Sequence, residues 1–136
     1  MEMIVRNRLY YAAASTSAIA GILHLILVPN VIGFNINTGI FFLVAGIAQL
    51  FWTLPTIRKW GLSWYLVGIG GTIVLIVLFA ITRMSGNPIT GRGGPVNPTS
   101  LAIEVLQAAF IGLTAAIIIY EIRRKRLDAK TAADAA

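Results

Sequence analysis

The sequence predicts an all-α integral membrane protein, an antiparallel four-helix bundle with both termini in the cytoplasm. Hydrophobic residues make up 57% of its 136 residues and charged residues only 12%, against roughly 45–50% and about 25% in soluble domains. The apolar residues also fall into four runs close to the ~20 residues that a bilayer core requires. Since lipid offers no hydrogen bonds to the backbone, each run is expected to be an α-helix. The chain is short enough to be a single transmembrane domain, 1–136.

Four spans are expected at about residues 9–29, 38–55, 62–82 and 101–120, followed by a basic cytoplasmic tail at 121–136. The first span is expected to stay in the protein, because its apolar stretch is too long for a signal peptide and "LVPN" offers no cleavage site. The segment "RMSGNPITGRGGPVNPTS" between the last two spans is rich in Pro and Gly and is expected to be irregular. The last residues, "DAKTAADAA", are expected to fray.

The distribution of basic residues predicts the orientation. By the positive-inside rule, the side with more Lys and Arg faces the cytoplasm of a multi-pass protein in the cell membrane. Only Arg83 and Arg92 fall on the outer side. The tail "RRKRLDAK" follows a span directly, which indicates an orientation signal and a contact with anionic membrane lipids, and argues against nucleic-acid binding. Nine of the eleven basic residues lie on the inner side: Arg6, Arg8, Arg58, Lys59, Arg123, Arg124, Lys125, Arg126 and Lys130.

Small and polar residues predict which helix faces meet. Lipid gives little hydrophobic drive for helix association, so close packing depends on small residues and polar partners. Each span carries a stripe of such residues at helical spacing, expected to face the bundle interior. The stripes are Ala13, Ser17, Gly21 and His24; Phe42, Ala45, Gly46 and Gln49; Trp64, Gly68, Gly71 and Thr72; and Glu104, Ala108, Gly112 and Ala115, with Gln107 alongside.

The candidate site is a group of intramembrane polar residues around the single histidine, His24. At about 1.5 Å per residue, His24, Glu104 and Gln107 lie roughly 8, 5 and 9 Å from the outer ends of their spans, so they are expected to meet. Gln49 lies about 17 Å deep by the same measure and is expected to join only through water or another residue. Arg83 is expected to approach Glu104 from outside.

Two interpretations of this site stay open. Ionisable residues inside spans are costly, which makes a functional role the default hypothesis. A structural role is favoured here, because a carboxylate near a helix N-terminus is stabilised by the helix dipole and His24 can donate to a carbonyl or to Glu104. With one histidine and no cysteine, the chain cannot alone supply a bis-histidine haem site and is a poor zinc or copper site. The metal and cofactor therefore stay unknown.

Several motifs also resemble a family. "AGILHLILVP", "GIFFLVAGIAQLFW", "TRMSGNP" and a fourth span with an early Glu resemble small uncharacterised four-span integral membrane proteins of archaea and actinobacteria. The positions that match that layout are His24, Gln49, Arg83, Pro88 and Glu104. In size and span count the chain is also similar to small accessory subunits of membrane oxidases and ammonia monooxygenase complexes. The resemblance implies the four-span fold and no particular activity.

These observations favour a non-catalytic membrane protein, an accessory or interaction subunit of a larger membrane complex or a homo-oligomer. No nucleophile, base and orienting group occur together, as nucleophilic catalysis requires. The alternative is a small binder or transporter that handles a proton, metal or quinone at an outer-leaflet His24–Glu104 site. A third possibility is a regulator that acts at the membrane surface through "RRKR".

Overall fold

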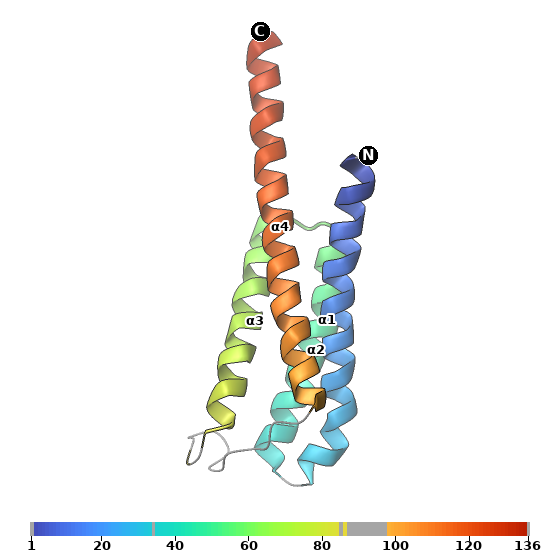
Figure 1. The fold of residues 1–136 in the computed structure, drawn as a ribbon, viewed down its shortest axis with the longest axis vertical. Coiled ribbons are helices and arrows are strands. Elements are labelled where there is room, and N and C mark those ends of the chain that lie inside the picture. The colour runs from blue at the N-terminus through green and yellow to red at the C-terminus, as the bar shows by residue number, and fades with distance from the viewer. Residues whose placement is uncertain (1, 34, 85, 87–97, 136) are drawn as a thin grey trace.

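The computed structural model describes residues 2–33, 35–84, 86 and 98–135, and this part of the chain forms four α-helices and no strand (Figure 1). The helices are α1 (Glu2–Ile32), α2 (Ile36–Ile57), α3 (Leu62–Thr82) and α4 (Pro98–Ala135). Each is long and apolar enough to cross a membrane. The predicted all-helical class with four long apolar helices is therefore confirmed, and it suggests a multi-pass membrane protein.

Several helix ends differ from the predicted ones because proline does not terminate these helices. α1 continues beyond Pro29 and α2 beyond Pro55, whereas the spans were expected to end there. Proline inside membrane helices is tolerated when neighbouring groups satisfy the freed carbonyl. At its other end α2 begins with an N-cap, in which the Asn35 side chain accepts a hydrogen bond from the Thr38 backbone N–H at 3.0 Å.

The four helices form a ring in chain order. α1 packs most extensively on α2 and then on α4, while α3 packs more lightly on α4 and α2. Within the described residues no close backbone contact crosses either diagonal of the ring. Both termini lie at one end of the bundle, which we call the terminal end. The last residues of α1 and α3 and the first residues of α2 and α4 lie at the other, the loop end (Figure 1).

Two glycines bring α1 and α2 together. A Cβ added at Gly21 would lie 2.9 Å from the Gly46 carbonyl oxygen, and one at Gly46 would lie 2.9 Å from the Gly21 carbonyl oxygen. One turn away, the Ser17 hydroxyl donates to the Gln49 carbonyl oxygen at 2.7 Å. The small-residue stripes predicted for these two spans are buried as expected.

The predicted stripe on α4 is wrong. Ala108 and Gly112 are exposed, and a Cβ on Gly112 would meet nothing within 4 Å. The face that points inward lies one residue to the side and carries larger and more polar side chains than expected. Its buried residues are Ser100, Ile103, Gln107, Phe110, Thr114 and Ile117. On α3, similarly, Gly68 and Thr72 are buried as predicted, while Trp64 and Gly71 are exposed.

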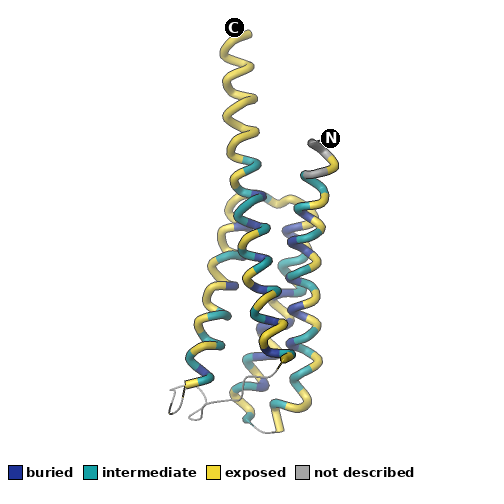
Figure 2. The backbone as a smooth tube through the Cα atoms, in the orientation of Figure 1, coloured by how far each residue is buried: buried dark blue, intermediate teal, exposed yellow. Residues whose placement is uncertain are grey.

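The tail is helical rather than frayed. α4 continues without a break from the apolar span to Ala135, and every residue of 122–135 is exposed. At about 1.5 Å per residue this part is roughly 20 Å long. Figure 2 shows it as an exposed stretch that projects beyond the bundle. Most of the loop predicted to be irregular, including Arg92 and Pro88, lies outside the described residues.

Aromatic residues gather near the terminal end, where α2 and α3 connect. Trp52, Trp60 and Trp64 form successive ring contacts around Phe51, with Trp60 and Trp64 at 4.9 Å between centroids. The Trp52 indole N–H donates to the Trp64 carbonyl oxygen at 3.0 Å. Tryptophan is enriched where a membrane helix meets the headgroup region, and the cluster lies beside the basic residues Arg58 and Lys59 in the sequence.

Candidate functional site

The structure brings His24 and Glu104 to one small cavity near the loop end. The cavity has a volume of about 10 Å³, and its walls also include Thr82, Ser100 and Phe42. That volume has room for about one water molecule. His24 is buried at 4% exposure, whereas Glu104 is half-buried. Of the five candidate residues, His24 and Glu104 thus line this cavity together.

His24 is held by its own helix rather than by Glu104. Its Nδ1 lies 3.0 Å from the Ala20 carbonyl oxygen. Since a carbonyl only accepts, Nδ1 carries the proton of this bond, and a neutral ring then has Nε2 as an acceptor. The ring edge packs on Phe42 at 5.2 Å between centroids. Among the described residues no hydrogen bond joins His24 to Glu104, so the expected fastening of the first span to the fourth through this pair is absent.

Arg83 approaches Glu104 as expected. Partial burial lowers the pKa of the Arg83 guanidinium, and the Glu104 carboxylate opposes that shift by raising it. The guanidinium also lies over the Phe79 ring at 4.4 Å from the centroid, a cation–π geometry. Arg83 thus places a positive charge at the loop end of α3, next to the cavity.

The two glutamines lie deeper in the bundle. Gln49 is 6% exposed and lies beside the His24 ring, although it was expected to join only through water or another residue, and its Oε1 is not within hydrogen-bonding geometry of a partner. Gln107 is 1% exposed. It does not line the His24–Glu104 cavity, so the expected meeting of His24, Glu104 and Gln107 is reached only by His24 and Glu104.

A regular spacing connects these residues. On α4 the inward polar residues recur every seventh position, the same spacing occurs on α1, and α2 adds one buried polar residue. Seven residues are close to two helical turns, so such residues share one face. We call this set the polar column. Its members are Ser100, Gln107, Thr114 and Glu121 on α4; Tyr10, Ser17 and His24 on α1; and Gln49 on α2.

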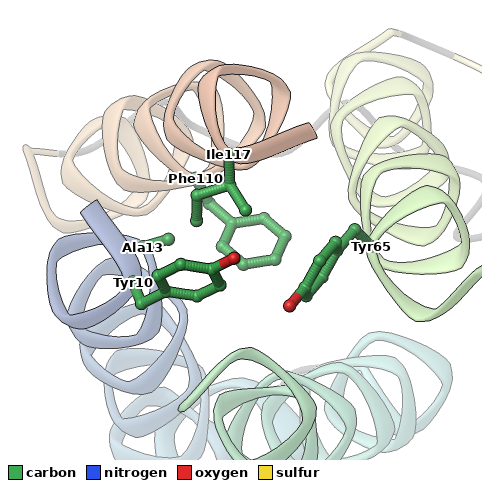
Figure 3. Close-up of a cluster of buried hydrophobic side chains, with 5 residues drawn as sticks. All are labelled: Tyr10, Ala13, Tyr65, Phe110 and Ile117. Carbon is green, nitrogen blue, oxygen red and sulfur yellow. The ribbon is translucent and has the colours of Figure 1, made fainter. Parts of the chain in front are cut away.

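The polar column ends in a cluster that the sequence analysis missed. The Tyr10 hydroxyl donates to Glu121 Oε1, and the Tyr65 hydroxyl lies 3.5 Å from the same oxygen. Figure 3 shows both tyrosine rings pointing into the bundle from α1 and α3, with the Phe110 ring behind them. Lys59 Nζ lies over the Tyr10 ring at 4.9 Å from the centroid. We call Tyr10, Tyr65 and Glu121 the terminal cluster.

Three side-chain atoms of the polar column lack partners. Gln49 Oε1, Gln107 Oε1 and Thr114 Oγ1 are buried without a hydrogen bond. A buried polar group without a partner costs about 1–3 kcal/mol, and valine or leucine at these positions would avoid that cost. Polar side chains that only fastened the helices together would be hydrogen-bonded across them. These three groups therefore need another explanation.

The described residues contain no group of three or more His, Asp or Glu side chains placed to hold a metal ion. No protein-family model, curated protein or solved structure matches the chain.

Proposed function

We propose that the chain is a non-catalytic multi-pass protein of the cell membrane, an accessory or interaction subunit of a larger membrane complex or of a homo-oligomer. The observation that carries this proposal is the outward position of Ala108 and Gly112 on α4. Small residues four apart are what membrane helices use to approach one another closely. Since the bundle does not use this pair, it is free for a helix of another subunit.

The charges and aromatic residues support the cytoplasmic location of both termini. The terminal end carries Arg58 and Lys59 near the tryptophans of α2 and α3, and the exposed part of α4 carries the basic run 123–126. Basic residues that follow a span on the cytoplasmic side also contact anionic lipids. The third possibility, a regulator acting through "RRKR", has no separate observation in its favour.

Native mass spectrometry after mild-detergent purification tests the main proposal. We expect the wild-type chain to appear in an assembly larger than its 14.6 kDa monomer. Replacing Ala108 and Gly112 together by leucine should return it to the monomer, while Val77→Leu, at an exposed position on α3, should leave the assembly intact. A wild-type monomer without copurifying subunits would contradict the proposal.

A second candidate function is proton binding at the His24–Glu104 cavity. The observation in its favour is the size of the cavity, about 10 Å³, which suits a water molecule or a proton and is far below the roughly 300 Å³ of a typical small-molecule pocket. A cavity of this size therefore suits a proton better than a quinone. A metal ion at this site would be coordinated by only two strongly binding side chains, His24 and Glu104.

Infrared difference spectroscopy across a pH titration tests the second candidate. We expect a protonated-carboxyl band that disappears in Glu104→Gln and shifts its titration in His24→Ala. The metal and quinone contents of the same three preparations are measured in parallel. An unchanged band in Glu104→Gln would refute proton binding there, and a metal or quinone present in the wild type but absent from both variants would favour the other ligands.

A further inference from the structure

The polar column reaches from one end of the apolar bundle to the other. Glu104 and Glu121 lie 17 positions apart on α4, which corresponds to about 25 Å at 1.5 Å per residue. The hydrocarbon core of a bilayer is about 30 Å thick. The two carboxyl groups thus lie near opposite borders of the membrane region, one at the His24 cavity and one in the terminal cluster.

Between these carboxyl groups the inward polar residues of α4 are Gln107 and Thr114, both essentially inaccessible to solvent. α1 and α2 add Ser17 and Gln49 between these levels, and both border a groove of about 210 Å³ between α2 and α3. Most of its lining is apolar, and Ser17, Gln49 and Thr72 supply polar side chains to it. Polar groups from three helices are therefore distributed along the whole length.

The unpartnered atoms point to a role other than packing. Thr114 Oγ1 and the two glutamine Oε1 atoms form no hydrogen bond within the protein. A hydroxyl without a partner adds nothing to helix association, but it can accept a proton from one side and release its own to the other. This is the behaviour that a proton relay requires.

Positive charges accompany both ends. Arg83 interacts electrostatically with Glu104, and Lys59 lies over Tyr10 beside Glu121. A positive charge therefore lies near the carboxyl group at each end of the bundle.

We propose that the polar column conducts protons through the bundle, between Glu121 at the terminal end and Glu104, which lies beside the column at the His24 cavity. A proton taken up from water at one face is matched by one released to water at the other, and each relay group ends with as many protons as it began with. Successive polar groups on α4 are about 10 Å apart, more than the ~3 Å of a hydrogen bond. Side chains of α1 and α2, together with water, must therefore complete the path. The inference rests on the second candidate function, proton binding at the His24–Glu104 cavity.

Proteoliposomes containing the purified full chain and an entrapped pH-sensitive dye test the proposal. A potassium gradient with valinomycin drives the flux, and protein-free vesicles give the background. We expect the wild-type proton flux to exceed that background. Thr114→Val should reduce this excess flux about tenfold or more. That is a smaller effect than the hundredfold or more contributed by a positioned proton-transfer group in an enzyme. Thr114→Ser, which keeps a hydroxyl, should retain the flux.

Thr16→Val is the matched control. It makes the same chemical change at a threonine whose hydroxyl bonds to the Ala13 carbonyl oxygen of its own helix at 2.8 Å, outside the polar column. Its flux should equal that of the wild type. Thermal unfolding separates relay from packing, because Thr114→Val removes an unpartnered polar atom and should unfold at the same or a higher temperature than the wild type.

Two results would overturn the inference: a wild-type flux equal to that of protein-free vesicles, or a Thr114→Val flux equal to that of the wild type. Should Thr114→Val not fold, a Glu121→Gln flux equal to that of the wild type would overturn it as well. The infrared band of Glu104 distinguishes the two proposals. A titrating Glu104 without flux would leave proton binding standing and remove conduction.

Discussion

The closest approach of two helices in this protein provides its sharpest stability prediction. In Gly21→Ala, the new Cβ would lie 2.9 Å from the Gly46 carbonyl oxygen and 3.1 Å from the Leu50 backbone nitrogen. Neither atom can rotate away, because both belong to the α2 backbone. The two helices must therefore separate by a few tenths of an ångström, and the Ser17–Gln49 hydrogen bond nearby must lengthen with them.

The size of the effect follows from two opposing contributions. Overpacking a well-fitted contact costs about 1–3 kcal/mol. Replacing glycine by alanine inside a helix gains up to about 1 kcal/mol. Gly70→Ala makes the same exchange on α3, where a Cβ would meet nothing within 4 Å. Both variants gain the same helix propensity, so this gain cancels when their free energies of unfolding are compared. The difference between the two should be about 1–3 kcal/mol, with Gly21→Ala the less stable.

Unfolding by sodium dodecyl sulfate in mixed micelles, followed by tryptophan fluorescence, measures this difference in the free energy of unfolding. Gly46→Ala should behave like Gly21→Ala but with a smaller loss, since part of its contact is with the flexible Leu25 side chain. Equal stability of Gly21→Ala and Gly70→Ala would refute the close α1–α2 contact.

Three further substitutions test other contacts by the same titration. Tyr10→Phe removes the hydroxyl that donates to Glu121, and a hydrogen bond to a charged group contributes about 1.5–3 kcal/mol; an unchanged unfolding free energy would exclude this bond. Ser17→Ala removes a 2.7 Å interhelical bond to the Gln49 carbonyl and should cost about 0.6 kcal/mol, with an upper limit near 1.7, so a larger loss would indicate a further role. Asn35→Ala removes the N-cap of α2 and should cost about 1 kcal/mol while Asn35→Asp costs little; equal losses would show that the cap contributes nothing.

The number and type of the helices could be predicted because both depend on composition over long windows. Four runs near twenty apolar residues leave no other backbone solution in lipid. The helix ends were less predictable. Proline was treated as a terminator, yet α1 continues past Pro29 and α2 past Pro55. Whether a helix tolerates proline depends on which neighbours satisfy the freed carbonyl, and that is a property of the tertiary structure.

The packing faces were predictable only where small residues decide them. On α1 and α2 the backbones meet at Gly21 and Gly46, so the small-residue rule selects the correct face. On α4 the same rule selected Ala108 and Gly112, which are exposed. The inner face of α4 contains Phe110 and Ile117, which form one buried cluster with Tyr10 of α1 and Tyr65 of α3, so large side chains rather than small ones decide this face.

Glu121 shows why the second half of the candidate site escaped prediction. The fourth span was ended at Tyr120 because hydropathy falls there, which placed the next carboxyl group in a solvated tail. α4 does not end where its hydropathy falls, and the spacing of seven from Ser100 through Gln107 and Thr114 carries Glu121 onto the same inward face. The face of a helix on which a residue lies depends on its spacing in the sequence from the other residues of that face. Hydropathy is an average over a window of the sequence and does not distinguish the faces. The signal for this site was therefore present in the sequence, as a polar seven-residue repeat within an apolar span.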